Sequence, residues 1–169
     1  MVDGTVLRNI LAYTRSWLLW LAASVAILFC AAAPAMAACS HAITLTENTA
    51  MSFGTIGVVA GGGTVTLNTA GSRTAPAGFF LSGTTAAGQF TASATSGAKN
   101  CAVVISFTAG SLTGPGTAMT INNFTNNAGA SPTLDGSGNL SFKAGADLII
   151  GANQKGGSYS GTYTVTVIY

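Results

Sequence analysis

The sequence contains very little charge. Only 6% of its 169 residues are charged. Beyond residue 37, four basic residues minus three acidic ones leave a net charge of +1: Arg73, Lys99, Lys143 and Lys155 against Glu47, Asp135 and Asp147. Binding to nucleic acid or to an acidic membrane surface needs a cluster of basic residues, so the composition excludes both classes.

Residue types that carry catalysis or bind metals are equally scarce. His41 is the single histidine, and no C-x-x-C motif is present, so a metal site is not supported. Asp135 opens an Asp-Gly-Ser-Gly turn, where its side chain is expected to cap its own backbone. Asp147 follows Gly145 closely and is interpreted as a turn residue at the start of a strand. We therefore predict no catalytic residues, no cofactor and no metal.

Long apolar runs are absent except near the N-terminus. Arg8 and Arg15 precede an apolar run over residues 17–33, and the small-residue motif Ala35-Met36-Ala37 follows it. This order is typical of a secretory signal peptide, here residues 1–37 with cleavage before Ala38. The prediction places residues 38–169 in the periplasm, at the cell surface or outside the cell. An uncleaved membrane anchor stays open as an alternative, because the run is near the lower limit of about 17 residues for a spanning helix.

Two cysteines remain after the predicted cleavage, since Cys30 belongs to the signal peptide. Cys39 and Cys101 would then lie in an oxidising compartment, where a disulfide is the simplest prediction. A disulfide that closes this loop of about 60 residues would stabilise the fold by about 4 kcal/mol. Lipidation of Cys39 is the alternative, because Met36-Ala37-Ala38-Cys39 is weakly similar to a lipoprotein cleavage site.

The clearest structural pattern is at the C-terminus. From residue 159 to residue 169 the sequence alternates, and one face would carry Tyr159, Gly161, Tyr163, Val165, Val167 and Tyr169. Side chains on a strand point to opposite faces in turn, so this pattern predicts a half-buried strand, which we expect to be the longest in the chain. Such a strand must pair within a sheet or leave an exposed edge.

Shorter alternating segments with turn signals between them fill the rest of the chain. They predict strands at residues 42–46, 51–58, 64–68, 78–82, 89–95, 101–107, 118–124, 140–142 and 147–150. This spacing favours an all-β fold, specifically an antiparallel immunoglobulin-like (pilin-like) sandwich of two sheets. Residues 38–169 are expected to form a single domain of this kind.

Several short motifs carry a resemblance to a known family. Ser52-Phe53-Gly54-Thr55-Ile56, Gly151-Ala152-Asn153-Gln154 and the stretch from Gly157 to Tyr169 resemble the bacterial secreted family called domain of unknown function 4402, over residues 42–169. A more distant similarity is to spore coat protein U and to chaperone-usher pilin subunits. Those sandwiches lack a strand, which a neighbouring subunit supplies by strand addition. Near the predicted mature start, the only segment this chain could donate is Ala42–Thr46.

The aromatic residues are mostly expected in the core, with one exception. Phe79 and Phe80 are adjacent, and neighbours on a strand cannot both face one core, so one of them is expected to be exposed. We predict an interaction surface from this pair and the C-terminal tyrosines: Phe79, Phe80, Tyr159, Tyr163 and Tyr169.

The function that these observations favour is structural. We expect a secreted or cell-surface protein, similar to fimbrial or coat subunits, that acts by strand pairing or packing with itself or with other surface proteins. The alternative is a monomeric adhesion or ligand-binding module that uses loops such as 69–79, 110–117 and 125–139. An enzyme is a third hypothesis, for which the sequence offers no constellation of residues.

Overall fold

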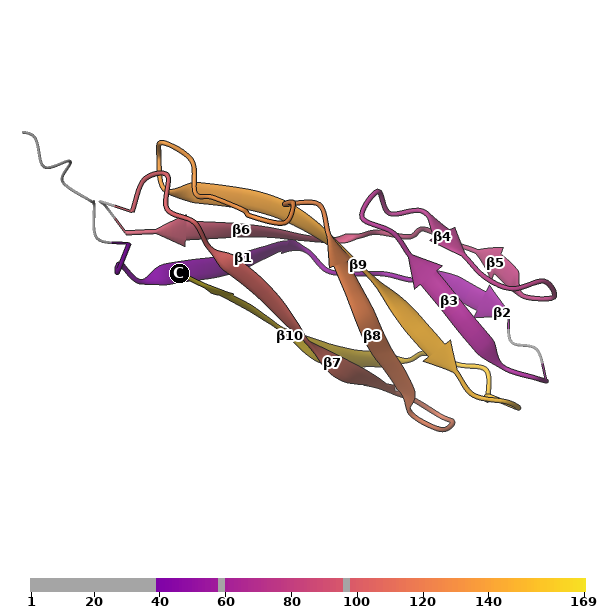
Figure 1. Cartoon of the computed structure of the whole chain (residues 1–169). Helices are drawn as coiled ribbons and strands as arrows, with labels where there is room; N and C mark the ends of the chain where they lie inside the picture. The colour runs from indigo at the N-terminus through magenta and orange to yellow at the C-terminus, as the bar shows by residue number, and fades with distance from the viewer. Residues whose placement is uncertain (1–38, 58–59, 96–97) are drawn as a thin grey trace, which may run out of the picture. The chain divides into compact units, whose positions relative to one another are not determined.

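The computed structural model describes residues 39–57, 60–95 and 98–169. The predicted signal peptide and its cleavage site lie outside these residues. The described part is all-β, with ten strands (Figure 1). Within those ranges, no helix long and apolar enough to cross a membrane is found.

The strands follow one another along the chain with short connections. They are β1 (Ile43–Thr49), β2 (Thr55–Gly57), β3 (Gly63–Leu67), β4 (Arg73–Thr74), β5 (Phe80–Ser82), β6 (Gly88–Ala94), β7 (Val104–Thr113), β8 (Met119–Asn126), β9 (Asn139–Ile150) and β10 (Ser160–Ile168).

Eight of these strands form one hydrogen-bonded sheet. Its main path runs β1-β6-β9-β8-β7-β10, while β3 pairs with the second half of β9 and β4 pairs with β3. The two remaining strands, β2 and β5, pair with each other in a small second sheet. Every one of these strand pairs is antiparallel, so the prediction of an all-β antiparallel fold is confirmed.

The longest strand is β9, and the prediction that the C-terminal strand is longest is wrong. β9 has 12 residues and β10 has 9. The sequence predicted two short strands in place of β9, because Ala144-Gly145-Ala146 interrupts the pattern of large residues. A Cβ atom on Gly145 would collide with the backbone oxygen of Leu67. The missing side chain of Gly145 therefore allows the end of β3 to approach β9 closely.

The two aspartates behave differently. Asp135 caps its turn as predicted, since its Oδ1 accepts hydrogen bonds from the backbone N–H groups of Ser137 (2.7 Å) and Asn139 (2.9 Å). These bonds lower the pKa of the Asp135 carboxyl group. The interpretation of Asp147 as a turn residue is wrong, because it lies within β9. There it accepts hydrogen bonds from Thr66 (2.6 Å) and from Asn123 (3.0 Å) on the neighbouring strands.

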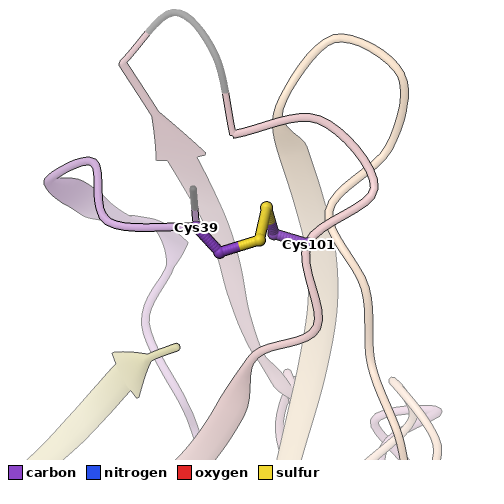
Figure 2. Close-up of a disulfide and its surroundings, with 2 residues drawn as sticks. All are labelled: Cys39 and Cys101. Carbon is purple, nitrogen blue, oxygen red and sulfur yellow. A yellow bond between two sulfur atoms is a disulfide. The ribbon is translucent and has the colours of Figure 1, made fainter. Parts of the chain in front are cut away.

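The predicted disulfide between Cys39 and Cys101 is confirmed (Figure 2). The two Cα atoms are 5.7 Å apart, and 62 positions separate the residues in the sequence. Cys101 is buried in a small cluster with Ala98, Val103 and Leu134. The bond ties the segment before β1 to the segment between β6 and β7, and the sulfur of Cys39 is not available for lipidation in this structure.

Candidate functional site

The first and last strands of the main sheet lie beside each other. β1 pairs with β6 alone, and β10 pairs with β7 alone. Ile43 of β1 and Val167 of β10 pack against one buried cluster. Leu45 of β1 and Val165 of β10 pack against a second one. Each step along the antiparallel path reverses direction, so β1 and β10 run in opposite directions. In the described residues no backbone pairing joins them, and we call the gap between them the seam.

The apolar side chains along the seam are incompletely covered. Leu45, Tyr163 and Val165 face inward but are only half-buried. By contrast, Phe90 of β6 and Phe142 of β9 are 4% and 2% exposed. The two strands beside the seam also present unpaired backbone edges, which is the arrangement that recruits an additional strand.

Two hollows follow the seam. The first, of about 290 Å³, is lined by Leu45, Glu47, Ala50, Met51, Phe90, Gly161, Thr162, Tyr163 and Val165. The second, of about 320 Å³, extends into the interior, and we call it the cavity. Its apolar walls come from Met51, Phe53, Ile56, Leu112, Met119, Ile121, Leu148, Ile150, Tyr159 and Tyr163. Both hollows are lined in part by Met51, Gly161 and Tyr163, so they lie next to each other, and we call the two together the trough.

A polar network stabilises one wall of the cavity. Gln154 is 6% exposed, and its Nε2 donates hydrogen bonds to the backbone oxygen of Thr117 (2.6 Å) and to the hydroxyl of Tyr159 (2.8 Å). The Tyr159 hydroxyl in turn donates to the backbone oxygen of Lys155 (2.8 Å). These bonds satisfy a buried amide and fix the Tyr159 ring at the side of the cavity.

Tyr163 occupies the centre of the trough. Its ring lies 5.1 Å from Phe124 of β8 and 6.5 Å from Phe90 of β6, measured between ring centroids. Its hydroxyl is buried and makes no hydrogen bond in the structure. Burial, and secondly the negative charge of Glu47, raises the pKa of Tyr163 to about 12.

The raised pKa predicts how Tyr163 responds to alkaline pH. An unfolded tyrosine ionises near pH 10. Since the folded pKa is about 12, the contribution of Tyr163 to stability is present below pH 10 and is lost between pH 10 and about 12. The ultraviolet absorbance of phenolate, compared between the wild type and Tyr163→Phe, should show one group with a midpoint near 12. If the tyrosine that Tyr163→Phe removes from the titration has its midpoint near pH 10, the prediction is contradicted.

The structure separates the five residues of the predicted interaction surface. Tyr159 and Tyr163 line the trough, whereas Tyr169 packs against the cluster around Cys101. Phe79 packs partly buried against the large cluster, over Gly63, where a Cβ atom would lie 2.9 Å from the Phe79 ring. Phe80 is 81% exposed.

Sequence reasoning did not single out Glu47, which lines the hollow beside β1. On β1, Glu47 falls on the same alternating face as Ile43 and Leu45, so it is a charged residue in an apolar series. That break in the pattern was the available signal.

Beyond the seam, the part of the chain described here contains no group of three or more His, Cys, Asp or Glu side chains placed to hold a metal ion.

Comparison with known proteins identifies the family and nothing more specific. Residues 43–169 match the family described as Domain of unknown function (DUF4402), and the chain belongs to this family. Neither the curated proteins nor the solved structures contain a match. The similarity to spore coat protein U and to pilin subunits therefore stays a prediction.

Proposed function

We propose that this protein is a secreted or cell-surface structural subunit, similar to fimbrial and coat subunits, that accepts an extended strand of another polypeptide in the seam. The supporting observation is the seam itself, where two unpaired strand edges flank a half-buried apolar strip. Where β1 and β10 are far enough apart, a strand placed there would pair with backbone groups on both sides and cover the apolar strip; where they approach closely, β1 would have to shift. Strand addition of this kind obtains affinity from main-chain hydrogen bonds and specificity from alternate side chains.

The proposal includes an immunoglobulin-like sandwich of two layers. One layer would contain β1, β6 and the first half of β9, and the other β7, β8 and β10. Two aromatic stacks support this assignment: Phe90 with Phe142 at 5.3 Å, and Phe107 with Phe124 at 5.1 Å between ring centroids. Tyr163 contacts one ring of each stack, as expected of a residue between two layers.

The direction of the strands beside the seam constrains the added strand. Because β1 and β10 run in opposite directions, one strand between them must be antiparallel to one neighbour and parallel to the other. Antiparallel pairing is slightly more stable per residue, and β10 offers the longer edge, with 9 residues against 7 in β1. We therefore assign the added strand an antiparallel orientation relative to β10.

The chain acts as the acceptor in this proposal. The segment considered for donation, Ala42–Thr46, overlaps β1, and β1 pairs with β6 of its own chain from Ile43 to Thr49. Donating that segment would remove a strand from the sheet and uncover Phe90.

A labelled peptide tests whether the seam accepts a strand. The protein would be expressed from the full-length gene, purified from an oxidising periplasm and mixed with fluorescent Val-Thr-Val-Thr-Val-Thr-Val-Thr. We expect the peptide to remain bound on an unheated denaturing gel and to be released by heating. Leu45→Arg, which places a charge in the seam, should weaken binding at least about tenfold, or about 1.4 kcal/mol.

The matched control is Thr44→Arg, one position away on the exposed face of β1. This variant should bind the peptide as the wild type does, and circular dichroism would show that both variants are folded. Failure of the wild type to bind, or equal binding by Leu45→Arg and Thr44→Arg, would contradict the proposed function.

A further inference from the structure

The hollow beside β1 contains a single charged side chain, that of Glu47. Glu47 follows Ile43 and Leu45 at alternate positions of β1, but its side chain is exposed, whereas Ile43 and Leu45 pack against buried clusters. It makes no ion pair with any residue that the structure describes. A carboxylate at the margin of an apolar trough discriminates among strands, because covering it without a positive partner costs free energy.

A second group without a partner lies next to Glu47. The Tyr163 hydroxyl is buried and makes no hydrogen bond, and Tyr163 lines the same hollow as Glu47. A lysine or arginine entering the hollow would donate to the exposed carboxylate of Glu47, where Tyr163 also lines the wall. Charge-assisted hydrogen bonds of this type are about twice as strong as neutral ones.

The cavity lies further along the trough, toward the start of β10. Its volume of about 320 Å³ exceeds the roughly 150 Å³ in which an engineered apolar cavity holds benzene. Met51 and Met119 contribute flexible thioether side chains to its walls, which adapt readily to an aromatic ring. The apolar part of the cavity is therefore suited to one large aromatic side chain, while Ser52, Gln154 and Lys155 line other parts of its wall.

We propose that the seam recognises a strand with a basic residue followed two positions later by a large aromatic residue, preceded by smaller apolar residues at alternate positions. A strand antiparallel to β10 passes Val167 and Val165 first, then Tyr163 with Glu47, and then the cavity. Residues two positions apart on a strand share a face, so the basic and aromatic side chains both enter the trough. This inference rests on the proposed function and specifies its partner.

The partner in this assignment differs from the described part of the chain. Among the described strands, the basic residues are Arg73 of β4 and Lys143 of β9. Ala75 and Gly145 stand two positions after them, where the motif requires a large aromatic residue. A second copy therefore offers no described strand of this pattern, and charge complementarity with Glu47 favours a different polypeptide.

Competition between matched peptides tests the motif. Val-Thr-Val-Thr-Lys-Thr-Phe-Thr should bind at least about tenfold more tightly than the versions with Glu for Lys or with Ala for Phe. It should also bind more tightly than the reversed order Thr-Phe-Thr-Lys-Thr-Val-Thr-Val. Glu47→Lys should reverse the preference, so that the peptide with Glu binds better. Lys99→Gln, a charge change at an exposed position outside the trough, should leave all affinities unchanged.

The outcomes separate the motif from the proposed function. If the Val-Thr peptide binds and the Lys-Thr-Phe peptide binds no better, the motif is overturned and the strand-accepting function stands. If no peptide binds, both are overturned. A ladder of the protein alone that collapses on heating would show that a second copy supplies the strand, which would overturn the assignment to a different polypeptide.

Discussion

Replacing both cysteines with alanine is expected to lower the free energy of unfolding by about 4 kcal/mol. The disulfide joins Cys39 to Cys101 across 62 positions of sequence, so it restricts the unfolded chain strongly. A domain of this size is stabilised by only about 5–15 kcal/mol in total, so the loss is a large share. Urea denaturation of the wild type and of the double variant Cys39→Ala with Cys101→Ala, both in oxidising buffer, measures the difference.

Reduction of the wild type provides the matched control. Treatment with a reducing agent should lower the urea midpoint of the wild type to near that of the double variant and leave the variant unchanged. A difference below about 1 kcal/mol between the oxidised proteins would contradict the role given to the disulfide. It would mean that the unfolded chain is already restricted by residual structure.

The second large effect is expected for Phe142→Ala, at about 3–5 kcal/mol. Phe142 is 2% exposed and stacks on Phe90 at 5.3 Å between ring centroids. Truncating the Phe142 side chain removes a large buried apolar area and leaves a void. The neighbouring strands are held by backbone pairing on both sides of β9, so they fill the void only in part. Thermal and urea unfolding of the variant measure the loss.

Phe80→Ala is the matched comparison, since the same side chain is removed from a position that is 81% exposed. Its effect on stability should stay within about 0.5 kcal/mol. An equally large loss for both variants would contradict the distinction between the covered core of the main sheet and the small β2–β5 sheet.

The alternating pattern predicted much of the fold because it is a local property. Tyr163, Val165 and Val167 face inward on β10 as their spacing indicated, although they are only half-buried. β9 was divided wrongly, since Ala144-Gly145-Ala146 carries no large side chain to continue the alternation. Gly145 and Ala146 are the residues that lie close to β3, a contact between distant parts of the chain that no local pattern contains.

The seam could not be predicted for the same reason. Alternation indicates which face of β10 is apolar, but the neighbours of a strand depend on the whole topology. The sequence therefore identified Tyr159 and Tyr163 as residues of interest without showing that both line one trough. Glu47 gained its significance only when β1 was placed beside β10, because a lone glutamate on a short strand is usually just solvated.

The position of the seam also affects how the chain folds. Its two sides are β1 and β10, strands that begin at Ile43 and Ser160, so the contacts across it close one of the longest loops in the described chain. Long loops cost more entropy to close and form slowly, and β10 is synthesised last. The inward face of β1 would therefore stay exposed until β10 has been synthesised and has folded beside it, and the trough would still be uncovered afterwards. Such a surface promotes aggregation, and under the proposed function the yield of soluble protein should depend on how soon a strand fills the seam.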